Sequence, residues 1–131
     1  MKGIRVLLVD DEIDYSLILA RRLEKRGLSV STAPGGCEAM TTLEGEKIDV
    51  VLLDIKMPGR DGVQLLGEIK RLYPHIEVVM LTAHINPDIV ISSLAMGAFD
   101  YLLKPADVDE LVSKIGDANQ RKMKDSDSKG C

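Results

Sequence analysis

The chain has 131 residues, of which 45% are hydrophobic and 29% charged, with a formal net charge of −4. This length fits one domain with an ordinary core and is too short for two well-packed domains. The negative charge argues against direct nucleic-acid binding, in which a basic face supplies most of the affinity. We expect no membrane association, because the longest apolar runs are far too short to span a bilayer.

The first residues, Met1 to Arg5, lead directly into a strand-like segment and lack the pattern of a signal peptide. The two cysteines, Cys37 and Cys131, have neither the spacing of metal ligands nor that of a disulfide framework. Free thiols are typical of a reducing compartment. These features predict a cytoplasmic protein.

Apolar, β-branched runs alternate along the chain with stretches of helical periodicity. The runs that predict strands are Ile4–Val9, Leu28–Thr32, Val50–Leu53, Val78–Leu81 and Phe99–Leu103. Three of them are almost continuously apolar, as in parallel strands that helices cover on both faces. The pattern predicts an α/β fold with a doubly wound, five-stranded parallel sheet and five helices. The strand order does not follow from the pattern, although 2-1-3-4-5 is the common five-stranded solution.

Turn and capping residues separate the predicted helices from the strands. Gly27 and Gly97 stand where helices should end, and Asn86-Pro87 places a capping residue before a proline at the first helical position. The sequence becomes polar near its end. We therefore expect one domain over residues 1–120, followed at 121–131 by a disordered polar tail or the beginning of a linker.

Polar residues follow the predicted strands at the points where these strands end. They are Asp10, Asp11 and Glu12 after the first strand, Asp54 after the third, Thr82 after the fourth and Lys104 after the fifth. The carboxyl ends of parallel strands lie at one edge of a sheet, where ligands bind in open α/β folds. Each residue alone has a structural interpretation, as a helix cap, a turn residue, a strand former or a solvated charge. Their joint occurrence at one edge favours a functional site.

The carboxylates of Asp10, Asp11 and Asp54 would repel one another if they were placed together. A hard divalent cation, Mg2+ or Mn2+, relieves this repulsion and leaves coordination positions for waters and phosphate. Lys104 adds a positive charge at the same edge. The sequence thus predicts a site for a metal ion and one further anion.

Residues 4–118 resemble the receiver domains of two-component response regulators. The similarity rests on Asp10-Asp11, Asp54–Gly62, Thr82-Ala83, Tyr101 and Lys104-Pro105. It implies the flavodoxin-like strand order of chemotaxis receivers, and the segment Gly97–Pro105 is similar to receivers attached to sigma-54-type transcription activators. In relatives the bond at the position of Lys104–Pro105 can be cis, but the sequence leaves both isomers open here.

The resemblance implies that Asp54 accepts a phosphoryl group from a sensor histidine kinase or a phosphotransfer protein. Asp11 and Asp54 would bind magnesium through their carboxylates, with the backbone carbonyl of Lys56, while Asp10 would act mainly through water. Phosphoryl transfer needs chiefly in-line positioning and neutralisation of charge. Small phosphodonors such as acetyl phosphate should therefore also react.

The same resemblance assigns the output of the switch. Lys104 would balance the charge of the phosphoryl oxygens, and Thr82 would donate a hydrogen bond to one of them. Thr82 would move toward the phosphoryl group, and Tyr101 would rotate inward into the space vacated. The surface formed by the fourth helix, fifth strand and fifth helix would then change.

Two further side chains are expected beside the phosphoryl group. Lys56 lies two residues after the acceptor and His84 two residues after the threonine. We predict that they slow hydrolysis by obstructing the attacking water. The alternative is that both are solvated loop residues without such a role.

Two other functions remain open at this point. A phosphatase of the haloacid dehalogenase kind also uses an aspartate nucleophile and magnesium, but its Asp-x-Asp motif after the first strand gives no role to Asp54. A receiver-shaped binding module without phosphorylation usually lacks one of the acids, the threonine or the lysine. We therefore expect a signalling switch and not an enzyme. Its kinase, its downstream partner or output domain, and any dimer formed on phosphorylation are not identified by the sequence.

Overall fold

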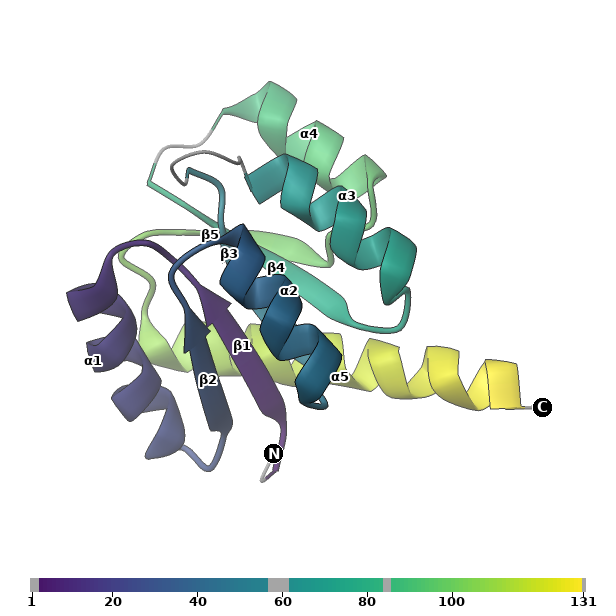
Figure 1. Cartoon of the computed structure of the whole chain (residues 1–131), viewed down its shortest axis with the longest axis horizontal. Helices are drawn as coiled ribbons and strands as arrows, with labels where there is room; N and C mark the ends of the chain where they lie inside the picture. Colours follow the sequence, from purple (N-terminus) through teal and green to yellow (C-terminus); the bar gives the residue numbers. More distant parts are fainter. Residues whose placement is uncertain (1–2, 57–61, 84–85, 131) are drawn as a thin grey trace.

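The computed structural model describes residues 3–56, 62–83 and 86–130. Its five strands are β1 (Arg5–Val9), β2 (Ser29–Ala33), β3 (Val50–Asp54), β4 (Glu77–Thr82) and β5 (Asp100–Leu103). They form one parallel sheet in the order β2-β1-β3-β4-β5 (Figure 1). Every residue of β3 and β4 is buried, as the continuous apolar runs predicted for strands covered on both faces. The predicted fold class and strand order are confirmed.

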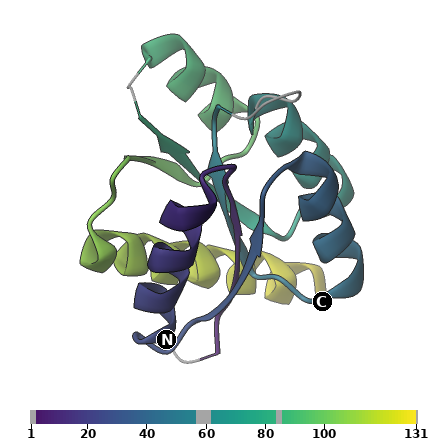
Figure 2. The same ribbon diagram turned by 60° about the vertical axis from the view of Figure 1, so that its left-hand side comes forward.

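The helices are α1 (Ile13–Glu24), α2 (Gly36–Gly45), α3 (Gly62–Leu72), α4 (Pro87–Ala95) and α5 (Val108–Gly130). Helices α1 and α5 cover one face of the sheet, and α2, α3 and α4 lie on the other (Figures 1 and 2). A hydrophobic core lies on each face of the sheet, and alternate strand residues point into one core or the other. Leu7 packs into the core beneath α2 and α3, and Leu8 into the core beneath α1 and α5. Both faces of the sheet are thereby sealed, and its carboxyl edge is left to carry polar groups.

The predicted helix boundaries are confirmed at three positions. Gly27 and Gly97 adopt positive φ angles of 92° and 109°, which glycine tolerates after a helix. The side chain of Asn86 accepts hydrogen bonds from the backbone N–H groups of Asp88, at 3.0 Å, and Ile89, at 3.4 Å. Asn86 therefore caps α4 in the way its sequence context predicted.

Helix α3 begins directly against the end of β3. The Gly62 N–H donates to the carbonyl oxygen of Ile55 at 2.7 Å. A Cβ atom at Gly62 would lie only 2.4 Å from the carbonyl oxygen of Asp54. Only glycine permits this approach, and it fixes the backbone that carries Asp54.

Helix α5 continues through residues 121–130, where the sequence predicted a polar tail or linker (Figure 1). Its Arg121 binds Glu77 with two guanidinium nitrogens, and Lys122 Nζ donates to Asp49 Oδ1 at 2.8 Å. Both acids are buried at the amino-terminal edge of the sheet. The polar composition of this segment did not reveal these partners, and the expected domain division at residue 120 stays a prediction.

Within the ranges described above, no helix is both long and apolar enough to cross a bilayer.

Candidate functional site

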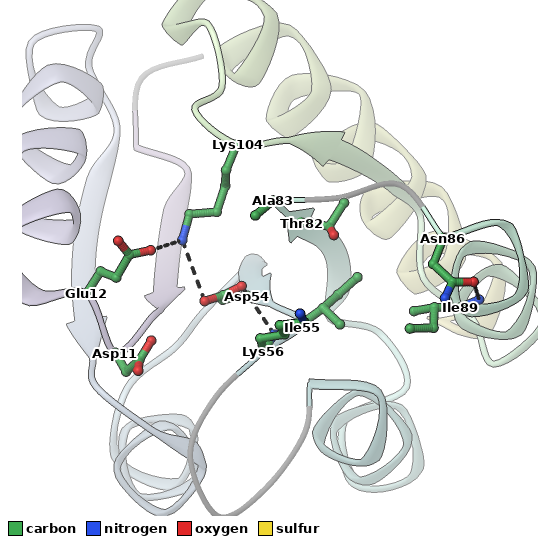
Figure 3. A pocket seen from close by; sticks show the side chains of 10 residues that line it. All are labelled: Asp11, Glu12, Asp54, Ile55, Lys56, Thr82, Ala83, Asn86, Ile89 and Lys104. Atoms are coloured by element: carbon green, nitrogen blue, oxygen red, sulfur yellow. Dashed lines mark hydrogen bonds and ion pairs between the residues drawn. The ribbon is translucent and has the colours of Figure 1, made fainter.

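The carboxyl ends of the strands meet around one open pocket of about 400 Å3 (Figure 3). In the sheet register Val9 pairs with Leu53, Asp54 with Leu81, and Thr82 with Leu103. The polar residues at these strand ends, and those just after them, therefore lie at the same level along the strand direction. The pocket is lined by Asp11, Glu12, Asp54, Ile55, Lys56, Thr82, Ala83, Asn86, Ile89 and Lys104.

Lys104 is a cation of this site, with only 9% of its side chain exposed. Its Nζ donates hydrogen bonds to Asp10 Oδ2 at 2.8 Å and to Glu12 Oε1 at 2.6 Å. The same nitrogen lies 3.6 Å from Asp54 Oδ2. Burial opposes the charge of Lys104, but the hydrogen bonds to the two neighbouring acids outweigh it and raise the pKa of the ammonium.

Asp54 ends β3 with 6% of its surface exposed. Burial, followed by the negative charge of Asp10, raises the pKa of Asp54 from 3.8 to about 6. Lys104 and the backbone N–H of Lys56, which lies 3.3 Å from Asp54 Oδ1, act in the opposite direction. The ionised form of Asp54 is therefore destabilised, and an added positive charge would stabilise it.

Three carboxylates approach one another beside the lysine. Asp10, Glu12 and Asp54 each offer an oxygen atom, and these atoms lie within 4.8 Å of one another. Such oxygen donors are those that magnesium prefers. Three carboxylates against one ammonium, counted over the residues that the structure describes, leave an excess of negative charge. The donor set and its charge fit a hard divalent cation.

The structure brings together Asp10, Asp54 and Lys104 as the sequence predicted, and it adds Glu12. Sequence reasoning placed Glu12 at the same sheet edge without assigning it a role, because spacing alone does not tell where a loop side chain points. Asp11 lines the pocket with an exposed side chain. The predicted set of metal ligands, including Asp11 and the Lys56 carbonyl, stays a prediction.

The two predicted switch residues occupy different depths. Thr82 is buried at the end of β4 and lines the pocket. Tyr101 is half-buried on β5 and packs against the core cluster on the α2–α3 side of the sheet. The roles of Thr82 and Tyr101 as a switch stay a prediction.

Of the two residues predicted to slow hydrolysis, the structure describes one. Lys56 is exposed and lines the pocket, whereas His84 lies outside the described residues, as do residues 57–61 of the segment that carried the resemblance. The Lys104–Pro105 peptide bond, whose isomer the sequence left open, is cis.

Comparisons with known proteins agree with this architecture. The family model described as the response regulator receiver domain matches residues 6–116. The DNA-binding transcriptional regulator NtrC of Escherichia coli (strain K12) is 42% identical over 110 residues, which are 84% of this chain and 24% of that protein. The transcriptional regulatory protein GlrR of the same organism is 37% identical over 128 residues, which are 98% of this chain and 29% of that protein.

A solved structure, the response regulator receiver domain protein (CheY-like) from Methanospirillum hungatei JF-1, superposes with a TM-score of 0.87 at 30% identity. The match covers 92% of this chain and 97% of that one. The chain spans about a quarter of the length of the curated relatives it matches. Because the family model covers most of the sheet and its helices, the chain belongs to the response regulator receiver domain family.

Proposed function

We propose that this receiver domain is a signalling switch that is phosphorylated on Asp54. The observation that carries the proposal is a buried carboxylate at the base of an open pocket, with a lysine ammonium 3.6 Å away. An acid in this position is accessible to a phosphodonor on one side and fixed by the sheet on the other. The family match supports the same residue as the acceptor.

In the proposed reaction a carboxylate oxygen of Asp54 attacks the phosphorus atom of the donor. The bond from phosphorus to the donor breaks, so the imidazole of a phosphohistidine, or the acetate of acetyl phosphate, leaves with its electron pair. An acyl phosphate remains on Asp54. Hydrolysis reverses the switch when water attacks the same phosphorus and returns inorganic phosphate and the free carboxylate.

The residues around Asp54 supply charge and hydrogen bonds. Lys104 is close enough to neutralise a phosphoryl oxygen, and Thr82 lies in the same pocket as a hydrogen-bond donor. Asp10, Asp11, Asp54 and the Lys56 carbonyl would hold a magnesium ion. When bound, that ion would neutralise charge on the carboxylates and the phosphoryl oxygens.

We further propose that the signal leaves through Thr82 and Tyr101. Thr82 would move toward the phosphoryl group and Tyr101 would turn inward, which changes the surface of α4, β5 and α5. The phosphodonor would be a histidine kinase or a phosphotransfer protein. The receiver of the signal would be an output domain or a partner, with a phosphorylation-dependent dimer as one form of the response. NtrC and GlrR are named as transcriptional regulators, which supports an output in transcription.

The net charge of −4 supports a domain that does not itself bind nucleic acid, and we place it in the cytoplasm. We propose no turnover of free phosphate esters, so that its chemistry is limited to acceptance and self-catalysed loss of the phosphoryl group.

Intact-protein mass spectrometry after incubation with acetyl phosphate tests the proposal. We expect the gain of one phosphoryl group that requires magnesium, is lost with hydroxylamine and is absent in Asp54→Ala. Asp117→Ala, an exposed acid on α5, serves as the control and should gain the group normally. A magnesium-dependent gain that persists in Asp54→Ala would assign the acceptor elsewhere.

A further inference from the structure

The ammonium of Lys104 is held on the β1–α1 side of the pocket. Its distances to Glu12, at 2.6 Å, and Asp10, at 2.8 Å, are hydrogen bonds, whereas its 3.6 Å distance to Asp54 is longer than a good one. Figure 3 shows Glu12 and Asp54 on different sides of the lysine nitrogen. The ammonium of Lys104 therefore lies closer to Glu12 and Asp10 than to Asp54.

Tyr15 adds a second contact from the same side. Its half-buried ring lies in the first turn of α1, and the Lys104 Nζ is 4.8 Å from the ring centroid. A cation at this distance from an aromatic ring is attracted by the electron density of its face. Glu12 immediately precedes α1, so one short segment provides both contacts.

The two acids that bind Lys104 differ in how firmly they are placed. Asp10 is 1% exposed and accepts the Glu12 N–H at 2.9 Å through its other oxygen, Oδ1. The Glu12 side chain is 64% exposed, so water can replace it at little cost. The contact with Glu12 is therefore the one that Lys104 can exchange.

We propose that Glu12 and Tyr15 are positioning residues that hold Lys104 in a resting site, and that phosphorylation requires the ammonium to leave Glu12 for the phosphoryl oxygen while keeping Asp10. This inference rests on the proposed function of Asp54. Residues at the start of α1 would thus slow the switch. The more strongly Glu12 and Tyr15 bind Lys104, the lower the rate of phosphorylation should be.

The first test is the rate of phosphorylation by acetyl phosphate and magnesium in the full chain. Glu12→Gln should raise this rate by about fivefold, the upper value of an exposed ion pair. Glu24→Gln, the same exchange at an exposed position near the other end of α1, should leave it unchanged. An unchanged or slower rate in Glu12→Gln would overturn the proposal.

Glu12→Asp separates the hold from simple charge repulsion of the phosphodonor. This variant keeps the negative charge but shortens the side chain, so the Lys104 contact is lost and the rate should still rise. A rate equal to wild type would mean that charge alone matters. Tyr15→Leu should also raise the rate, by about twofold, and Tyr15→Phe, which keeps the ring, should raise it less. Equal effects of the two Tyr15 variants would contradict the role of the ring.

A second readout does not depend on phosphorylation. In the metal-free protein, the exchange of the Lys104 ammonium hydrogens with water can be followed by 15N NMR. We expect exchange to be at least about threefold faster in Glu12→Gln and Glu12→Asp than in wild type, since a hydrogen bond to a charged acceptor is lost. Unchanged exchange would refute the resting site. If wild type accepted no phosphate, the proposed function of Asp54 would fail, and this measurement alone would decide on the resting site.

Discussion

Replacing Asp54 by asparagine should stabilise the metal-free protein at neutral and alkaline pH. An ionised Asp54 lies buried beside the negative charge of Asp10, and both effects raise its pKa from 3.8 to about 6. Asparagine has nearly the same shape and cannot ionise. It therefore removes the cost of the charge without opening a cavity.

The sign and size follow from the two pKa values. Between pH 4 and pH 6 the folded protein retains a proton that the unfolded chain has already released, so the stability of wild type falls as pH rises. Above pH 6 the full cost applies. A shift of roughly two pKa units corresponds to about 3 kcal/mol at about 1.4 kcal/mol per unit.

The assay is urea denaturation followed by circular dichroism, at a series of pH values from 4 to 8 in the presence of a chelator. We expect Asp54→Asn to exceed wild type in free energy of unfolding by about 2–3 kcal/mol at pH 8. The difference should shrink to a few tenths near pH 4. Asp117→Asn on α5, an exposed position, should stay within about 0.5 kcal/mol of wild type throughout.

Magnesium adds a second arm to this experiment. The ion should stabilise wild type and reduce its deficit, because it compensates the charge that asparagine removes. If Asp54→Asn were no more stable than wild type at pH 8, or if its advantage were the same at pH 4, burial and repulsion by Asp10 would not control this carboxyl.

Three further outcomes can be checked in the same protein. Gly62→Ala should lower the free energy of unfolding by about 3 kcal/mol, because the added Cβ would meet backbone atoms at the end of β3. Gly45→Ala, where the added Cβ meets open space, should instead raise the free energy of unfolding by about 0.5–1 kcal/mol. Glu77→Gln should lower the free energy of unfolding by about 2 kcal/mol at pH 7, measured by urea denaturation. Burial opposes the charge of Glu77, but Arg121 and Lys70 outweigh it and lower the pKa of this carboxyl below 4.5. The difference should therefore begin to shrink only below about pH 4.5 and disappear as the pH falls through the lowered pKa of the folded protein. The double change Lys56→Ala and His84→Ala should accelerate loss of phosphate from the phosphorylated protein, measured by mass spectrometry, and an unchanged lifetime would remove their proposed role in hydrolysis.

The fold was predictable because its signals are local and repeated. The apolar run Val50–Leu53 became a wholly buried strand, and Asn86 became the cap of α4. A parallel sheet then brings the carboxyl ends of all its strands to one edge, whatever conformation the loops adopt. For this reason the convergence of Asp54, Thr82 and Lys104 could be predicted from strand boundaries alone.

The finer arrangement of the site was not predictable in the same way. Glu12 lies between β1 and α1, where no periodicity fixes the direction of a side chain. Whether it or Asp11 turns toward Lys104 depends on the conformation of a short turn. The buried acids Asp49 and Glu77 present the same difficulty. Arg5 and Lys70 supply one cation to each, but the other two cations, Lys122 and Arg121, lie in a segment whose composition suggested no contacts.

Those ion pairs bear on where the domain ends as a folding unit. The family match stops at residue 116, yet Arg121 and Lys122 form ion pairs with Glu77 and Asp49, the acids buried at the amino-terminal edge of the sheet. A chain shortened to residue 120 would retain every family motif and lose both of these cations. The family match therefore ends at least one helical turn before the last residues that form these ion pairs. A shortened domain is expected to melt at a lower temperature while keeping the proposed phosphorylation site intact.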